Sequence, residues 1–302
     1  MVCAKSQTHK IDELAGIVHP RDGHPKIYAM IDAYLDESGI HDGAAVCVIS
    51  GYYCGRGQWR KFEALWRKTL AQFNVPLEKF HAKNLVKRRG FFDSWNDQIF
   101  TAFLDALASA IIEYKIHPVT VGVVIADFFS FSHSQRRFLT GARLEDGKLI
   151  SSGAPGKPYF CPFQECVARV AESAPVGGKA HFFFGLDRPF AGYAHAFMDD
   201  ILAHPYARVH NQIGRSPAFP LAKETPQLQA ADLLAYVSYL DMTDRLKNNS
   251  WDEIPDTYLR LLIENRKCMN DFCYFEKNAM QIALNRTYEL TGNWDGHLDI
   301  ST

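Results

Sequence analysis

Alternating polar and apolar positions predict a β-hairpin near the start of the chain. From Lys26 onward the odd-numbered positions 27 to 35 are all apolar, whereas the even-numbered positions include Asp32 and Asp36. A period of two is typical of a strand with two different faces, and it puts Asp36 at the carboxyl end on the more polar face. The turn SGIHDG contains an Asp-Gly pair, and AAVCVISGYY predicts the returning strand.

A helical period follows the hairpin. Residues 58–73 predict an amphipathic helix with Glu63 at the edge of its apolar face. Ser94 is expected to cap the next helix, whose apolar positions at core spacing are Ile99, Phe103, Leu107 and Ile111. The continuous apolar run VTVGVVIADFF predicts an interior strand. Residues 132–158 are rich in Gly, Ser and charge, and they predict an inserted loop.

The second half of the chain continues the mixture of strands and helices. YFCPFQECVARVAES predicts a helix, KAHFFFGLD a strand that ends on Asp187, YAHAFMDDILAH a helix and AFPLAKE a further strand. Thr225 and Pro226 suit the cap and first turn of the helix PQLQAADLLAYVSYL. Residues 245–290 predict further helices. We therefore expect a flexible arm (1–25), an α/β domain (26–244) and a helical C-terminal extension (245–302).

Composition narrows the class of protein. The chain has 302 residues, 47% of them hydrophobic, and 33 Lys and Arg against 34 Asp and Glu. It can bury a large core, and it lacks an overall basic footprint for nucleic acid, although a local basic groove is compatible with this balance. No apolar stretch predicts a membrane span and the N-terminus lacks a secretory apolar region, so we expect a cytoplasmic protein without a membrane partner. Seven cysteines without nearby zinc-ligand partners predict buried thiols.

Three acidic residues stand where ionisation is costly. Asp36 and Asp187 each end an apolar strand, and Asp232 is surrounded by Ala and Leu on an apolar helix. Each has an ordinary explanation: a turn cap for Asp36, a pair with Arg188 for Asp187, and a bond to Gln229 for Asp232. Together they predict a site for Mg²⁺ or Mn²⁺, which prefer oxygen ligands. Two such ions, roughly 4 Å apart, can bind the attacking and leaving oxygens of a phosphoryl displacement.

Four short motifs in this order carry a resemblance to a known family. YLDESG, FHAKNL, a strand ending in FGLD, and LQAADLLAY together resemble the uncharacterised bacterial and phage family called domain of unknown function 3800. The likeness extends from about residue 30 to residue 240. It implies the ribonuclease-H-like superfamily, with an α/β fold in which helices flank a mixed five-stranded β-sheet.

The resemblance implies a role for each acidic residue. Asp36 would be the central metal ligand, Asp187 the second and Asp232 the ligand from the late helix. Glu37 lies on the opposite side of the strand if the pleat persists, or turns back toward the metals where the strand ends. Glu63 could supply a helical ligand, but a solvated helix charge is the interpretation we favour for it.

Three further residues bear on this site. His81 in FHAKNL matches the histidine of the family and could transfer a proton, or could instead hydrogen-bond within the core. Asp127, at the end of VTVGVVIAD, competes with Asp187 as the second ligand. Glu224 stands where the family pattern has a serine, so it is either an additional ligand or a sign that the metal site is altered.

Basic and aromatic residues near His81 predict a nucleic-acid surface. Basic groups neutralise phosphates and aromatic rings stack on bases, although such runs are also common in solvated loops. The basic residues are Lys79, Lys83, Lys87, Arg88 and Arg89, and the aromatic residues that follow are Phe91, Phe92 and Trp95. SQRRF, residues 134–138, could add a second phosphate contact.

Two functions therefore compete. The first is a divalent-metal-dependent nuclease that hydrolyses RNA or DNA at a two-metal carboxylate site. The alternative is a catalytically decayed ribonuclease-H-like module that binds nucleic acid or protein. A Ser-His-Asp hydrolase is disfavoured because DESG lacks the G-x-S-x-G elbow. A homo-oligomer is compatible with either function.

Overall fold

The computed structural model describes residues 30–140, 142–145, 148–151, 157–185, 188–203, 209–215, 217–251, 257–263 and 272–291. The predicted N-terminal arm, residues 1–25, lies outside these ranges.

A five-stranded mixed sheet forms the centre of the protein. Its strands are β1 (Met30–Ser38), β2 (Val46–Gly55), β3 (His117–Val124), β6 (Lys179–Phe184) and β7 (Phe272–Phe275), in the order β6-β1-β2-β3-β7. β2 is antiparallel to both of its neighbours, whereas β6 runs parallel to β1 and β7 runs parallel to β3. Two isolated parallel bridges, Ala180 to Ile213 and Phe183 to Ala218, add a strand-like segment beside β6.

The predicted hairpin is confirmed, with one change at Asp36. β1 pairs with β2 up to Ser38, which lies opposite Val48, so the strand continues two residues beyond Asp36. Gly39 then opens the turn with a φ of +79°, where an added Cβ would lie 2.1 Å from the carbonyl oxygen of Val46. Only glycine tolerates both the left-handed backbone and this close approach.

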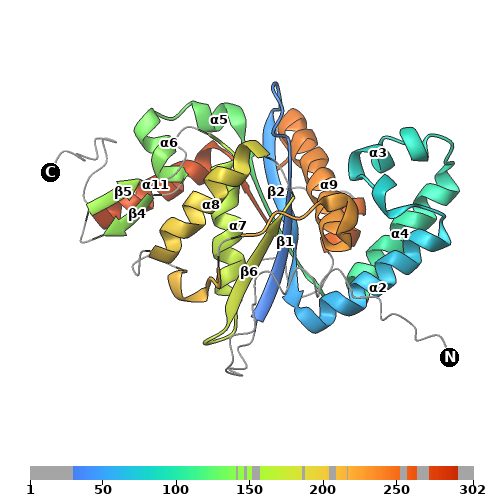
Figure 1. Ribbon diagram of the computed structural model, residues 1–302. Helices are drawn as coiled ribbons and strands as arrows, with labels where there is room; N and C mark the ends of the chain where they lie inside the picture. Colours follow the sequence, from blue (N-terminus) through green and yellow to red (C-terminus); the bar gives the residue numbers. More distant parts are fainter. Residues whose placement is uncertain are drawn as a thin grey trace.

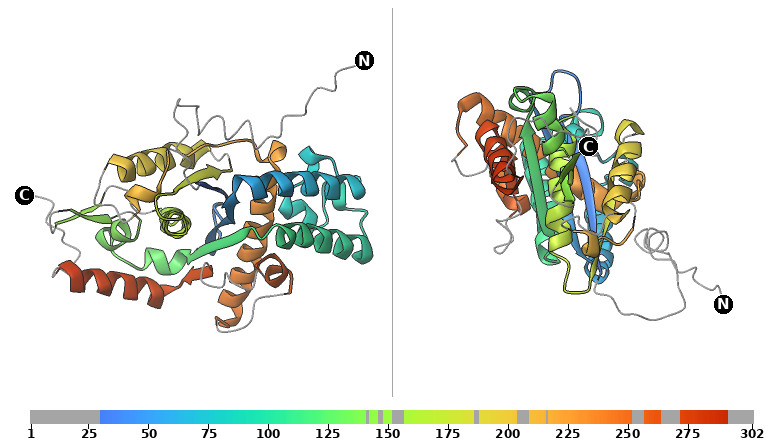
Figure 2. Two further views of the ribbon diagram at one scale, coloured as in Figure 1. Left: turned by 90° about the horizontal axis from the view of Figure 1, so that it is seen from below. Right: turned by 90° about the vertical axis from the view of Figure 1, so that its left-hand side faces the viewer.

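Helices cover both faces of the sheet (Figures 1 and 2). One layer contains α2 (Arg56–Gln72), α3 (Ala82–Val86), α4 (Asp97–Glu113), α9 (Pro226–Asn248) and α10 (Thr257–Ile263). The opposite layer contains α5 (Ile125–Phe129), α6 (His133–Leu139), α7 (Phe160–Glu172), α8 (Arg188–Ala203) and α11 (Lys277–Thr291). Single 3₁₀ turns lie at Leu77–Lys79, Gly90–Phe92, His210–Gln212 and Ala222–Glu224. The protein is thus an α/β fold with an open mixed sheet between two helical layers.

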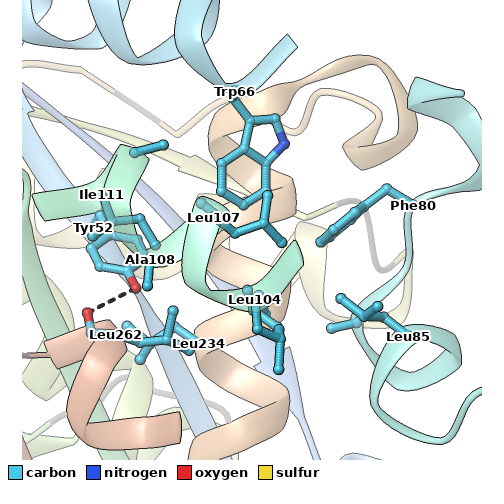
Figure 3. Close-up of a cluster of buried hydrophobic side chains, with 14 of the residues drawn as sticks. Tyr52, Trp66, Phe80, Leu85, Leu104, Leu107, Ala108, Ile111, Leu234 and Leu262 are labelled. Atoms are coloured by element: carbon cyan, nitrogen blue, oxygen red, sulfur yellow. Dashed lines mark hydrogen bonds between the residues drawn. The ribbon is translucent and has the colours of Figure 1, made fainter. Parts of the chain in front are cut away.

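Alternation along β1 divides its side chains between two cores. Tyr34 faces the α9 layer, where its ring stacks on Phe183 at 4.5 Å between centroids, whereas Ala33 and Leu35 face the α7 layer. On the α9 side, the hydroxyl of Tyr52 donates a hydrogen bond of 3.1 Å to the carbonyl oxygen of Leu262 within a cluster of aliphatic and aromatic side chains (Figure 3). Full burial of each large apolar side chain contributes about 1.5–3 kcal/mol.

Residues 132–158 were expected to form a loop, and this prediction is wrong. They include α6 and a separate hairpin of β4 (Ala142–Glu145) and β5 (Lys148–Ser151). α6 starts with a capping box, in which the Ser132 hydroxyl accepts from the Gln135 amide and the Gln135 side chain accepts from the Ser132 amide. This S-x-x-Q signal overrides the polar composition of the segment. AFPLAKE is also not a strand, since it contributes one bridging residue, Ala218, and a 3₁₀ turn.

The C-terminal segment is not a purely helical extension. α9 continues to Asn248, across the predicted domain boundary at 244, and β7 joins the main sheet beside β3. Residues 272–275 thus complete the central sheet. They were not predicted as a strand because FCYF is too short to show a period of two and its partner strand is distant in the chain.

Asn96, not Ser94, caps α4. Its side-chain oxygen accepts a hydrogen bond of 2.9 Å from the amide of Ile99. The helix therefore begins later than expected, and Ile99 is 41% exposed while its neighbour Phe100 is buried.

Replacement of the cap provides a matched test. Asn96→Ala is expected to lower the free energy of unfolding by about 1 kcal/mol, because the Ile99 amide loses its acceptor. Ser94→Ala is expected to change it by less than about 0.5 kcal/mol, since Ser94 is exposed. Urea unfolding of both variants measures the difference, and equal effects would contradict the assignment.

Candidate functional site

Asp36 is held where β1 meets β6. Its side chain has the same parity as Tyr34 and so lies on the α9 side of the sheet. Its Oδ1 accepts a hydrogen bond of 3.1 Å from the amide of Glu37. The carboxylate packs against Gly185, where an added Cβ would lie 2.2 Å from Oδ1. The amide of Gly185 donates 3.1 Å to the carbonyl oxygen of Leu35, which fixes this close approach.

Asp187, the predicted second ligand, lies outside the described residues. β6 ends at Phe184, so the regular strand stops before the acid that was expected to end it.

Asp232 and His81 come together where α9 meets the start of α3. Oδ2 of Asp232 accepts a hydrogen bond of 2.8 Å from the amide of Ala82, and it lies 3.9 Å from Nδ1 of His81. His81 caps α3, since Nδ1 accepts from the amide of Lys83 at 3.2 Å. A neutral ring whose Nδ1 accepts carries its proton on Nε2. The ring is 57% exposed, so this proton is open to exchange.

The alternative explanation of Asp232, a bond to Gln229, is not observed. The Gln229 side chain accepts from the indole nitrogen of Trp66 at 3.0 Å and donates to the carbonyl oxygen of Leu77 at 2.7 Å. Gln229 therefore joins α9 to α2 and to the following turn, and Asp232 has different partners.

Burial raises the pKa of Asp232 above its usual value of 3.8, and the nearby His81 and the Ala82 amide oppose this shift. A raised pKa means that the folded protein holds the proton more tightly than the unfolded chain. The contribution of the Asp232 carboxyl to folding stability is therefore fully present below pH 3.8. It is lost as the pH rises from 3.8 through the folded pKa.

Asp232→Asn removes this loss because the asparagine amide does not ionise, and its oxygen can still accept from the Ala82 amide. In metal-free buffer the variant is expected to melt above the wild type near neutral pH, with a difference that shrinks toward pH 3.8. Melting temperatures measured across this range test the expectation, and a difference that grows as pH falls would contradict it.

Glu63 is a buried ion pair and not a solvated charge. Its side chain is 1% exposed, and Oε1 accepts from Nε and Nη2 of Arg67 at 3.0 and 2.9 Å. Oε2 accepts from the Gln227 side chain at 3.3 Å. Oε1 is thus used within α2 and Oε2 joins α2 to α9, so the contacts support a structural role for Glu63.

The other acidic candidates lie elsewhere. Glu37 faces the α7 side because the pleat of β1 persists, and its charge contributes to the raised pKa of the buried Cys47. Asp127 lies in α5 and not at a strand end, and its Oδ2 accepts from the amide of Lys277 at 3.0 Å, at the start of α11. Glu224 is an exposed residue of the 3₁₀ turn before α9.

The basic residues around His81 differ in whether they are exposed or engaged in contacts within the protein. Lys83, Lys87 and Arg89 are exposed. Arg88 is engaged, since it pairs with Asp97 and its guanidinium lies 4.8 Å from the ring centre of Phe100. Lys79 is exposed as well, so four of the five predicted basic residues keep the charge expected of a phosphate-binding surface.

Two of the aromatic residues predicted to stack on bases belong to the core. Phe92 is fully buried, and Trp95 packs edge-on against Phe103 at 5.1 Å between centroids. Phe91 is 39% exposed. SQRRF forms part of α6, on the opposite side of the sheet from α9, where Arg136 lies over the ring of Phe129. Burial excludes Phe92 from base stacking, whereas Trp95 is half-buried and Phe91 is exposed. SQRRF lies away from Asp232.

A buried pair of titratable residues on the same face of the sheet was not predicted from the sequence. Asp32 and His181 are adjacent across β1 and β6, with 3.5 Å between Oδ1 and Nδ1, and they are 1% and 4% exposed. The imidazole packs on Gly214, where an added Cβ would lie 2.0 Å from Nε2. The alternation in β1 that drew attention to Asp36 applies equally to Asp32. Its partner, His181, is separated from Asp32 by most of the domain in sequence, so the pair could not be predicted.

Tyr236 and Tyr239 were also missed. They follow Asp232 by four and seven residues on α9, and their rings stack at 6.3 Å with an interplanar angle of 27°. The i, i+4, i+7 spacing places all three on one side of the helix, a signal present in the sequence.

The site thus belongs to an α/β protein in which β1, α9 and the α3 segment meet on one side of an open mixed sheet. Within the described ranges, no three His, Cys, Asp or Glu side chains gather as a potential metal site. No helix in this part of the chain is both long and apolar enough to cross a membrane. Comparisons with protein-family models, curated proteins and solved structures give no match.

Proposed function

We propose that this chain is a divalent-metal-dependent nuclease with a ribonuclease-H-like fold, which hydrolyses phosphodiester bonds of RNA or DNA. The proposal rests on one observation. Asp36 on β1 and Asp232 on α9 belong to the same side of the sheet, and the exposed imidazole of His81 lies 3.9 Å from Oδ2 of Asp232. The mixed sheet between two helical layers supports the fold that the resemblance implies.

The donor chemistry suits Mg²⁺ or Mn²⁺. Asp36 and Asp232 supply hard carboxylate oxygens, and the Ala82 amide uses only Oδ2 of Asp232. Asp187, which follows β6 closely in the chain, would be the third ligand. When bound, the ions would neutralise these carboxylates and stabilise the charge that develops on the phosphate.

The remaining residues act on the substrate. His81 would exchange a proton at Nε2 with a reacting oxygen, since Nδ1 already accepts from the Lys83 amide. Lys83, Lys87 and Arg89 would contact phosphates, whereas Arg88 would hold the segment in place through Asp97.

A cleavage assay tests the proposal. Labelled single-stranded RNA, single-stranded DNA and an RNA–DNA hybrid are incubated with Mn²⁺, Mg²⁺ or EDTA. Cutting of at least one substrate with metal but not with EDTA is expected. Melting in the same buffers provides a second readout, since metal at about 100 times its Kd stabilises the folded state by about 2.7 kcal/mol.

A folded protein that cuts none of these substrates and shows no metal-dependent shift in melting temperature would contradict the nuclease. That result would favour the alternative, a ribonuclease-H-like module that binds nucleic acid or protein without catalysis.

A further inference from the structure

We infer that this site takes single-stranded nucleic acid, and that Tyr239, supported by Tyr236 and His41, is the surface on which a base stacks. The inference rests on the proposed nuclease function, because it names the substrate class of that site. α9 carries both Asp232 and the two tyrosines.

Tyr236 and Tyr239 differ in their burial. Tyr236 is 7% exposed and belongs to the core on the α9 side, whereas Tyr239 is half-buried at the edge of that core. The two rings stack on each other. Neither hydroxyl has a hydrogen-bond partner within the part of the chain that the structure describes. Because the Tyr236 ring is buried and stacked, it holds the more exposed ring of Tyr239 in place from one side.

The turn between β1 and β2 supports Tyr239 from a second side. A Cβ added to Gly39 would lie 2.8 Å from Cε2 of Tyr239, so the ring rests directly on the backbone of the turn. His41 in the same turn is exposed, and its ring lies 6.4 Å from that of Tyr239 at an angle of 70°. Figure 1 shows this turn next to α9. Gly39 is three residues beyond Asp36, so the aromatic surface adjoins the strand end that carries the predicted ligand.

Positive charge reaches the same surface from the α3 segment. Burial raises the pKa of Tyr236 and the neighbouring Tyr239 adds to this shift, whereas the positive charge of the exposed Arg89 opposes it. Lys83 follows Ala82, whose amide binds Asp232. Aromatic faces beside exposed cations favour single strands, because a paired base is stacked within its duplex and cannot offer its face to Tyr239.

Binding without cleavage tests this inference. Fluorescence anisotropy in EDTA measures the Kd of labelled oligonucleotides of about 12 nucleotides, a length within the usual site size. Single-stranded RNA and single-stranded DNA are compared with duplex DNA. Wild-type protein is expected to bind at least one single strand about tenfold more tightly than the duplex, and Tyr239→Ala is expected to weaken that binding about tenfold or more.

Two variants separate stacking from stability. Tyr239→Phe keeps the ring and is expected to bind within about twofold of the wild type, since stacking uses the face and not the hydroxyl. Phe129→Ala removes another exposed ring, 48% exposed on α5 in the opposite layer, and its binding is expected to be unchanged. Melting temperatures establish that each variant is folded.

The outcomes separate this inference from the nuclease. Equal affinity for duplex and single strands, or unchanged binding by folded Tyr239→Ala, would overturn the inference even if the protein cleaves with metal. Tyr239-dependent binding without any cleavage would support the inference while the nuclease fails.

Discussion

Asp36→Asn is expected to lower metal-dependent cleavage by roughly a hundredfold to ten-thousandfold. A metal contributes several kcal/mol of charge stabilisation in a transition state, and each 1.36 kcal/mol corresponds to a factor of ten in rate. The amide keeps the shape of the carboxylate against Gly185, and its oxygen can still accept from the Glu37 amide. The loss should therefore fall on the reaction and not on the fold. Initial rates under Mn²⁺ and Mg²⁺ measure it.

Glu37→Gln is the matched control. It removes the same charge one residue later in β1, but Glu37 faces the α7 side of the sheet. Its rate is expected to stay within about threefold of the wild type, because Glu37 lies on the side of the sheet away from Asp232. Full activity in Asp36→Asn, or equal losses in both variants, would remove Asp36 from the metal site.

Gly51→Ala is expected to destabilise the protein by about 3 kcal/mol or more. Gly51 is buried in β2, and an added Cβ would lie 1.9 Å from the carbonyl oxygen of Tyr34 and 2.8 Å from Cα of Leu35. Both obstacles are backbone atoms of β1, so a side-chain rotation cannot relieve the clash and the two strands must separate. Overpacking typically costs about 1–3 kcal/mol, and a rigid obstacle raises that cost. Thermal or urea unfolding measures the loss.

Gly57→Ala provides the comparison. Gly57 lies in the first turn of α2, is exposed, and has no atom within 4 Å of an added Cβ. Alanine there is expected to be neutral or to stabilise the protein by up to about 1 kcal/mol, because it favours the helix. Similar unfolding free energies for the two variants would show that β1 and β2 do not approach as closely at Gly51 as the structure indicates.

Local signals predicted much of the fold. The period of two around Asp36, the Asp-Gly turn and the Pro226 helix start all act within a few residues, and each led to the observed element. Predictions failed where contacts with residues distant in the chain determine the secondary structure. β7 is a strand because β3 pairs with it. The two-residue shift at the start of α4 arose because Ser94 and Asn96 are both good caps, and the sequence pattern alone did not choose between them.

The candidate site was less predictable because its contacts join distant segments. The spacing of α9 showed that Asp232 was unusual, but not that the Ala82 amide would bind it. Glu63 looked solvated because its burial depends on α9, which carries its distant partner Gln227. The i, i+4 spacing to Arg67 was a signal present in the sequence. Phe92 and Trp95 looked exposed beside charged neighbours, whereas Phe92 is buried in the core and Trp95 is half-buried against it.

The late position of β7 has a consequence for synthesis. β1, β2 and β3 can pair soon after they leave the ribosome, but β3 keeps one edge open until β7 is made. An open strand edge is a template for pairing with other chains, and pairings between distant segments form slowly. A nascent chain that stalls or is cut before residue 272 would therefore present the edge of β3 to its neighbours and aggregate, whereas release of the finished segment closes that edge from within the same molecule.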